Sequence, residues 1–515
     1  MNGIFNAVDQ LFAFVVPIAD FLWDFPTNYE WYSSIPILGQ FSLGILFLLG
    51  CGIFFTFRLG FVQIKEFGTG IRLLTKKVDT DHVGTTPLQA FLISMGGRVG
   101  AGNIVGVTGA ISIGGPGAIF WMWLSALFGM STAFCEATLA QLFKERKGNE
   151  YVGGFTYYIQ KIWKNKLWVG TAMCVMYLIY NLLSIPVHTF HVFTAASSIM
   201  NEMIGRTTEV NEPAYYVIAL AIIAILIIIA FGGIKKAVGF ADRAVPVMAI
   251  LYIVITLVLI VINLDKVPGF FAAIFVEAFK PHAIFGGAFG VTLAQGLKRA
   301  LLSNEAGMGT STQASSIADQ NHPCEQGFIQ AIGVFVDTIL ICSMTGFIVA
   351  GGAIWEDKNI NWEELHLDKI GTFLASVKAL VPGESMDSAV VIFVALAFGL
   401  FAFTTLVCDI TYSEIAANKI SQSKEFIRLI RILAAVVFVP LGTLTVLAGL
   451  QLDNLWYVSD LINIILVFIN VPTLIIGRKL VMAAYKDYKE SKGRRFVAAN
   501  IGLESDVWTE EAAQK

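Results

Sequence analysis

The chain has 515 residues, of which 56% are hydrophobic and 14% are charged, and its mean hydropathy is +0.70. A soluble protein with this balance would lack the polar side chains needed to cover its surface, so we expect an all-α membrane protein. The net charge of −3 argues against a nucleic-acid partner, and the six cysteines lie mostly inside apolar runs, which is not the pattern of a disulfide framework.

The N-terminal segment, residues 1–35, is interpreted as interfacial. No basic region precedes its first apolar stretch, and Asp9, Asp20 and Asp24 interrupt that stretch, so we expect neither a cleaved signal peptide nor a span there. We expect instead a helix that lies in the membrane interface over residues 4–25.

Hydropathy predicts about eleven spans, approximately over residues 36–57, 87–113, 117–142, 167–200, 213–231, 242–263, 283–318, 326–352, 388–408, 428–449 and 455–477. They divide the chain into an extra helix with its loop (36–86), two five-helix repeats (87–263 and 264–480) and a tail (481–515). The seventh span is too long for one straight crossing, so we expect its ends to project or its middle to break.

Basic residues distinguish the two sets of loops. One set includes Arg58, Lys76, Lys144 and Lys235 and ends with the basic tail, whereas the opposite set holds few lysines and arginines. The positive-inside rule places the basic set in the cytoplasm, with the N-terminus outside and the C-terminus inside. We expect a multi-pass protein of a bacterial-type cytoplasmic (inner) membrane.

The second predicted span is interrupted by glycine. Six glycines fall between Gly96 and Gly109, and each costs a helix interior about 1 kcal/mol relative to alanine. Small-xxx-small patterns such as Gly102 to Gly106 often indicate only close helix packing. The neighbouring Arg98 and Asn103, and a second segment of this kind, favour a broken helix that holds a solute. A nucleotide-binding loop is excluded, because no strand precedes it.

The second segment opens five spans later, near His282. It contains Gly286, Gly287 and Gly290, and continues through Thr292 to Ser303-Asn304-Glu305-Ala306-Gly307-Met308-Gly309. Two glycine-interrupted segments at matching places in two five-helix halves predict an inverted repeat with the solute site between them.

A broken helix offers paired chemistry to a solute. Free N–H groups at one half-helix suit a carboxylate, and free C=O groups at the other suit an ammonium or a sodium ion, so a zwitterionic amino acid matches both. Thr404 and Thr405 in the ninth span could complete an oxygen shell around a cation, although helix threonines usually bond to preceding carbonyls.

Ionisable residues inside spans are candidates for function, and the alternative is a structural ion pair. These are Arg98, Glu136, Glu305, Asp337 and Asp409. We expect Arg98 to pair with one of the acids. His188 and His191 share a helix face but have no third ligand nearby, which favours pore-lining or packed histidines over a metal site.

The segment Gly114–Gly129 (GGPGAIFWMWLSALFG) resembles the signature of the sodium:alanine symporter family, which comprises alanine or glycine:cation symporters with a LeuT-type fold. Further similar segments are Arg58–Phe61, Val99–Val107, Ser303–Gly309 and Phe401–Thr405. The resemblance extends from about Arg58 to about Arg478.

The resemblance implies a solute site at Gly100, Ala101, Gly102, Asn103 and Ile104, with Phe289, Gly290 and Thr292 of the seventh span. It also implies a sodium site at Gly96, Val99, Thr404 and Thr405. The sequence departs from the family in the fourth span, where His191 stands roughly in place of a glutamine, and after Thr405, where the stretch to Glu414 includes Asp409.

We therefore expect a sodium-coupled symporter of a small neutral amino acid, alanine or glycine, that works by alternating access as a monomer in the lipid bilayer. A proton symporter of the same fold and a passive channel or sensor are the alternatives. An enzyme is not expected, because no clustered nucleophile and base or metal triad is present, and no cofactor is expected beyond the transported sodium ion.

Overall fold

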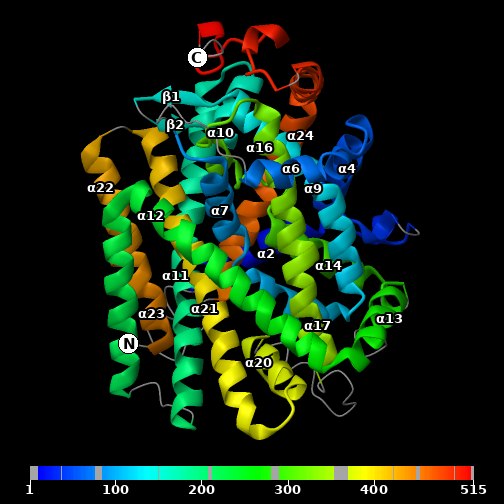
Figure 1. Cartoon of the computed structure of the whole chain (residues 1–515), viewed down its shortest axis with the longest axis vertical. Coiled ribbons are helices and arrows are strands. Elements are labelled where there is room, and N and C mark those ends of the chain that lie inside the picture. Colours follow the sequence, from blue (N-terminus) through cyan, green and yellow to red (C-terminus); the bar gives the residue numbers. More distant parts are fainter. Residues whose placement is uncertain are drawn as a thin grey trace.

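The computed structural model describes residues 10–35, 38–75, 84–148, 150–206, 212–279, 289–352, 369–421, 423–447, 453–491 and 493–511 (Figure 1). Within these residues, regular structure is helical apart from one antiparallel hairpin, formed by β1 (Glu145–Lys147) and β2 (Glu150–Val152). The all-α class predicted from composition is confirmed. Glycines 286 and 287 of the second glycine-rich segment, and His282, lie outside the described residues.

Eight helical stretches in the described part are long and apolar enough to cross a membrane, or nine if a bent pair counts as one span. Six of them are uninterrupted α-helices or parts of one: α9 (Ala118–Leu142), α11 (Leu167–Ile204), two parts of α12 (Pro213–Ile262), α21 (Glu384–Ile420) and α24 (Asp453–Ser491). The remaining two join shorter helices: α16 (Pro323–Val334), η5 (Phe335–Cys342) and α17 (Ser343–Gly351), then α22 (Lys424–Ile432), η6 (Leu433–Phe438) and α23 (Val439–Leu447).

Two predicted spans correspond to shorter helices of 16 residues each, α4 (Leu43–Arg58) and α14 (Phe289–Asn304). The total of eleven crossings stays a prediction. The remaining described helices are α2 (Val15–Asp24), α3 (Glu30–Ser33), η1 (Leu38–Gln40), α5 (Val62–Lys65), α6 (Phe67–Thr75), α10 (Phe155–Ile162), η3 (Leu264–Lys266), α13 (Val267–Glu277), α15 (Thr312–Ser316), α20 (Lys369–Leu380) and η7 (Ala498–Ile501).

The loop expected around Lys235 is part of a helix. Both predicted spans of this region belong to α12, which remains helical from Pro213 to Ile262 and turns back on itself in Figure 1. A hydropathy profile sees the polar residues but not the helical hydrogen bonds that continue through them.

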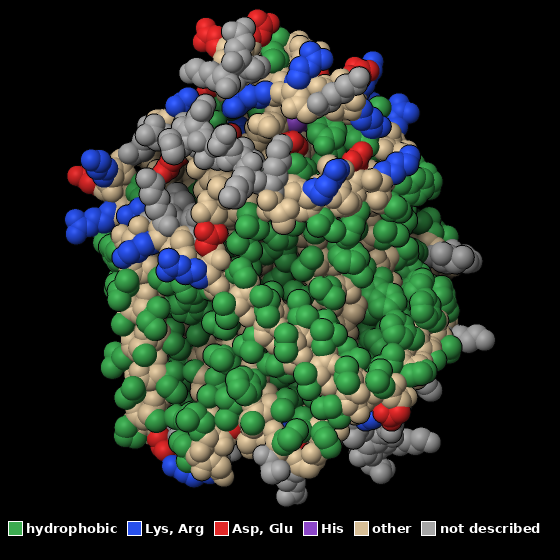
Figure 2. All heavy atoms as spheres, in the orientation of Figure 1, with side chains coloured by type: hydrophobic (Ala, Val, Ile, Leu, Met, Phe, Trp, Pro, Cys, Tyr) green, Lys and Arg blue, Asp and Glu red, His purple; other side chains and the backbone are tan. Residues whose placement is uncertain are grey.

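The surface fits a lipid environment. Figure 2 shows a broad band of hydrophobic side chains, while charged side chains gather above it at the end that carries the C-terminus. Along α12, Val217, Leu220, Ile250 and Val261 are each more than 60% exposed, which is unfavourable in water but not in lipid. The chain is a multi-pass membrane protein.

The first glycine-rich span is broken as predicted. It starts at Thr86, whose side chain forms a capping box with Gln89, and runs as α7 (Pro87–Arg98). After the break come a π-helical turn, η2 (Gly102–Gly106), and α8 (Val107–Gly114), and the two parts meet at an angle of 49°. A π turn inside a helix is frequent at functional sites.

The seventh predicted span is also broken. Helix α14 ends at Asn304, and the chain then passes through positive φ angles at Glu305 (57°), Gly307 (100°) and Gly309 (84°) before α15 begins. The break therefore lies near Gly307, whereas Gly290 is helical. Helix α14 contacts η2 and α8, and α15 contacts α7, so the two broken segments pack against each other.

The C-terminal tail packs on the end of the molecule. Trp508 is 1% exposed, and its Nε1 donates a hydrogen bond of 2.8 Å to the main-chain oxygen of Gln141. The ammonium of Lys144 lies 4.7 Å from the Trp508 ring and 4.0 Å from the Tyr151 ring, and donates a hydrogen bond of 2.8 Å to the oxygen of Ala318. The tail is thus joined to α9 and to the segment after α15.

Candidate functional site

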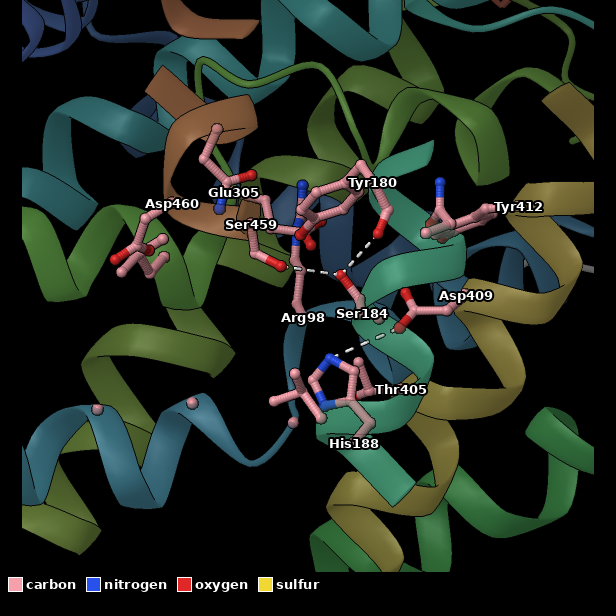
Figure 3. A pocket seen from close by; sticks show the side chains of 18 of the residues that line it. Arg98, Tyr180, Ser184, His188, Glu305, Thr405, Asp409, Tyr412, Ser459 and Asp460 are labelled. Carbon is pink, nitrogen blue, oxygen red and sulfur yellow. Dashed lines mark hydrogen bonds and ion pairs between the residues drawn. The ribbon is translucent and has the colours of Figure 1, made fainter. Parts of the chain in front are cut away.

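A pocket lies beside the first break (Figure 3). Its walls come from the break and from four further segments: the face of α11, the end of α14, the second half of α21 and the start of α24. The lining residues include Gly100, Gly102, Tyr180, Ser184, His188, Arg299, Glu305, Thr405, Asp409, Tyr412, Ser459 and Asp460. Many of these side chains carry polar groups, although the surrounding helices are apolar.

Asn103 holds the break in place. Its Oδ1 accepts a hydrogen bond of 2.9 Å from the N–H of Gly100, which supplies one main-chain group of the break with a partner. Its Nδ2 donates to Ser303 Oγ at 2.9 Å and to Asp337 Oδ1 at 2.6 Å. Ser303 in turn donates to Asp337 Oδ2 at 2.7 Å. Asn103 therefore binds other parts of the protein and is fully buried.

The residues implied for sodium are partly brought together. The Thr405 hydroxyl donates hydrogen bonds of 3.1 Å to the main-chain oxygens of Gly96 and Phe401. A Cβ atom on Gly100 would clash with the same hydroxyl, so the break and α21 are in close contact. Thr404 points elsewhere, because its hydroxyl donates to Phe401 and to Met248 on α12.

Val99 is 1% exposed and ends the first half of the broken span. Within the described residues, no group of three or more His, Cys, Asp and Glu side chains is arranged to hold a metal. The oxygens near Gly96 and Thr405 are the candidates for a monovalent cation.

The second break is held by a buried carboxylate. Glu136 on α9 is 0% exposed, and its Oε1 accepts hydrogen bonds from the N–H of Gly307 (3.0 Å) and from Asn470 Nδ2 (2.6 Å). Asn470 also donates to the oxygen of Gly307 at 2.9 Å, and its own oxygen accepts a hydrogen bond from Tyr158. Both main-chain groups of Gly307 are thereby satisfied where the helix is open.

Arg98 joins the two breaks without forming a salt bridge. Its guanidinium donates to the oxygen of Gln330 at 3.2 Å and to the Ser311 hydroxyl at 2.8 Å, and the residue is 2% exposed. Glu305 and Asp337 attract it through longer-range electrostatics. The expected direct pair with an acid is not found in the part of the chain that the structure describes.

Apart from His188, the stripe of polar residues on α11 was not singled out from the sequence. Tyr177, Tyr180, Ser184 and His188 follow one another at helical spacing and line the pocket together with Asn181. Ser184 and Ser459 on α24 lie 3.1 Å apart and share a hydrogen bond. The periodicity of polar residues within an apolar span was the signal that could have identified this face.

His188 on α11 and Asp409 on α21 both line the pocket and face each other (Figure 3). Nε2 of His188 lies 3.6 Å from Oδ2 of Asp409, which is within ion-pair distance, as the dashed line in Figure 3 marks, but too long for a hydrogen bond. Among the described residues, neither Asp409 Oδ2 nor His188 Nδ1 has a hydrogen-bond partner.

Several predicted solute residues lie outside the pocket lining. His191 packs against the rings of Phe190 and Phe398, with centroids 5.7 and 5.8 Å away. Ala101 and Ile104 are fully buried, so within the break only Gly100 and Gly102 of the five predicted residues line the pocket.

The predicted residues of the seventh span lie at its opposite end. Thr292 donates a hydrogen bond of 2.7 Å to the oxygen of Gly114, and the Phe289 ring packs on Trp121. Gly290 lies against Gln40. The pocket is lined instead by Leu302 and its neighbours, about ten residues and roughly 15 Å further along the helix.

Comparison with known proteins gives consistent matches along the chain. A family described as the sodium:alanine symporter family matches residues 32–499. The amino-acid carrier protein AlsT of Bacillus subtilis is 35% identical over 487 residues, which cover 93% of this chain and 98% of that protein. The probable sodium/glutamine symporter GlnT of the same organism is 35% identical over 88% of each chain. The crystal structure of MhsT in complex with L-phenylalanine has 16% sequence identity and a TM-score of 0.54, and covers 83% of this chain and 94% of that one.

Proposed function

The chain belongs to the sodium:alanine symporter family, and we propose that it couples inward sodium movement to the uptake of a small neutral amino acid by alternating access. The LeuT-type fold expected from the resemblance is confirmed. Membership of this family makes the chain an amino-acid symporter, whereas the ion, the solute and the residues that hold them are proposals.

The observation that best supports the proposal is the contact of Thr405 with the broken helix. The oxygens of Gly96 and Thr405 lie side by side, next to Gly100, at one edge of the polar pocket. A sodium ion there would bind between the two segments, and the solute backbone would occupy the neighbouring space at Gly100 and Gly102. Each ligand would then strengthen binding of the other by the same factor.

The proposed orientation follows the surface charge. The charged end of the molecule with the C-terminus would face the cytoplasm, and the N-terminus would lie outside a bacterial-type cytoplasmic membrane. A membrane potential of 100 mV then contributes about 2.3 kcal/mol for each sodium ion that enters. We propose transport by a monomer without a cofactor and without enzymatic activity.

A proton in place of sodium is the second candidate, and the titratable pair His188 and Asp409 in the pocket favours it. The experiment is uptake of labelled alanine and glycine into proteoliposomes that contain the purified protein. Uptake that needs an inward sodium gradient supports the proposal. Uptake in sodium-free buffer driven by a pH gradient would replace it with the proton mechanism, and the absence of exchange of labelled against unlabelled solute would indicate a channel or sensor.

A further inference from the structure

We propose that the His188–Asp409 pair receives the side chain of the solute and selects an amino acid with a side-chain carboxamide. The inference rests on the proposed function and specifies its substrate. Its starting point is a pair of polar groups that line the pocket, face each other at 3.6 Å and form no hydrogen bond with each other.

The position of Asp409 suits a side chain rather than the solute backbone. Asp409 and Thr405 are four residues apart on α21, so they share a helix face at a separation of one turn, roughly 5–6 Å. Thr405 is in contact with Gly100 at the break. A solute whose backbone lies at the break would therefore reach Asp409 with a group a few bonds beyond its α-carbon.

The burial of Asp409 makes a missing partner costly. Its side chain is 9% exposed, and its Oδ2 accepts no hydrogen bond from any residue that the structure describes. Nδ1 of His188, on the facing helix, is buried and likewise has no hydrogen-bond partner within the described part of the chain. A solute that fills this part of the pocket with a methyl group would exclude water and leave both groups unsatisfied.

A carboxamide supplies what the pair lacks. Its NH₂ group donates to the carboxylate of Asp409, and its oxygen accepts from the imidazole N–H of His188. A side-chain carboxylate would be repelled by Asp409, and an ammonium would have no acceptor to offer His188. Two arginines and two further acids also line the pocket, Arg98 and Arg299 with Glu305 and Asp460, so the surrounding charges favour neither a cationic nor an anionic side chain. A neutral group that both donates and accepts fits these surroundings best.

The test is competition for sodium-driven uptake of labelled alanine by the wild-type protein in proteoliposomes. Unlabelled glutamine or asparagine should inhibit at a concentration at least about tenfold lower than unlabelled alanine, while glutamate and lysine should inhibit less than alanine. Equal inhibition by glutamine, asparagine and alanine would overturn the inference and leave the proposed function intact. The absence of sodium-driven uptake for every amino acid would overturn both.

Variants test whether the preference for a carboxamide side chain depends on the His188–Asp409 pair. Asp409→Leu should reduce the ratio of glutamine to alanine affinity by about tenfold, and Asp409→Asn, which keeps an acceptor, should reduce it less. The matched control is Thr411→Val, because Thr411 lies on the same helix outside the pocket lining and donates to Val407. An Asp409→Leu protein that loses affinity for both solutes equally would contradict the assignment. The wild-type competition decides the matter if a variant fails to fold.

Discussion

The hydroxyl of Thr405 donates a hydrogen bond of 3.1 Å to the main-chain oxygen of Gly96. The bond joins α21 to the last turn of α7, immediately before the chain opens. Because a sodium ion at this place would be coordinated by both oxygens, we expect Thr405→Val to raise the sodium concentration that gives half-maximal uptake by roughly tenfold, since one oxygen ligand is lost.

Thr404→Val is the matched control, because the Thr404 hydroxyl is directed to Met248 and Phe401. Its sodium dependence should remain close to that of the wild type. Both values come from initial uptake rates measured over a series of sodium concentrations. An unchanged value for Thr405→Val would place the ion elsewhere.

The break tolerates a side chain at one glycine but not at another. A Cβ on Gly100 would meet the Thr405 hydroxyl, whereas a Cβ on Gly102 would have no atom of the described residues within 4 Å. We expect Gly100→Ala to lower uptake strongly and Gly100→Leu to abolish it, with folded protein still present in the membrane. Gly102→Ala should retain more uptake than Gly100→Ala. The checks are uptake per molecule and gel filtration, and wild-type uptake by Gly100→Leu would refute the site.

The carboxylate of Glu136 should stabilise the fold through the second break. Glu136→Ala removes the acceptor for Gly307 and Asn470, and each unsatisfied buried donor costs roughly 1–3 kcal/mol. Glu136→Gln keeps an oxygen acceptor and should lose less stability. Thermal unfolding in detergent measures both, and Glu490→Ala on the exposed end of α24 is the neutral control. Equal unfolding temperatures for wild type and Glu136→Ala would contradict this role.

Docking of the tail should depend on pH through Lys144. Burial lowers the pKa of Lys144 from 10.5 to about 7, although two aromatic rings favour its charged form. Release of the tail exposes Lys144 and returns its pKa toward 10.5, so release takes up a proton between about pH 7 and pH 10. Docking is therefore weakest at and below about pH 7 and strengthens as the pH rises through this window.

A spin label at Glu504→Cys, an exposed position in the tail, reports docking through its mobility. We expect the label to be less mobile at pH 9.5 than at about pH 7. The change should disappear in a Lys144→Met background. Identical spectra at both pH values with Lys144 present would show that Lys144 does not control docking.

The sequence was sufficient to predict most of the fold and the glycine-rich segment of the second break, but not that the helix opens at the Gly307 end of this segment. Glycine alone does not distinguish an open helix from a closely packed one: at Gly296 a Cβ would clash with the main chain of Ala118, yet α14 stays helical there. The helix opens near Gly307, where Glu136 and Asn470 satisfy the exposed main-chain groups. Those partners come from helices remote in sequence, so no local pattern reveals them.

For the candidate site, too, some of the residues predicted from the sequence line the pocket and others do not. Gly100, Gly102 and Thr405 were predicted and line the pocket. His191 was predicted because it stands roughly where the family has a glutamine, but in the structure its ring packs against Phe398. Periodicity in the sequence predicts which face of a long helix is turned toward a cavity. It does not predict which turns along that face border the cavity, because this depends on how far the side chains of neighbouring helices extend.

The hydrogen bonds of Asn103 also lead to an expectation about how this protein moves. Asn103 links the first break by hydrogen bonds to Ser303 on α14 and to Asp337 on η5, so these three segments share one buried hydrogen-bond network. If this hydrogen-bond network stays intact through the transport cycle, the first break, α14 and η5 move together as one rigid body. Opening to either side of the membrane is then a displacement of this body against α11 and α21. Distances between the first break, α14 and η5 would then stay constant, while the distances from these segments to α11 and α21 change.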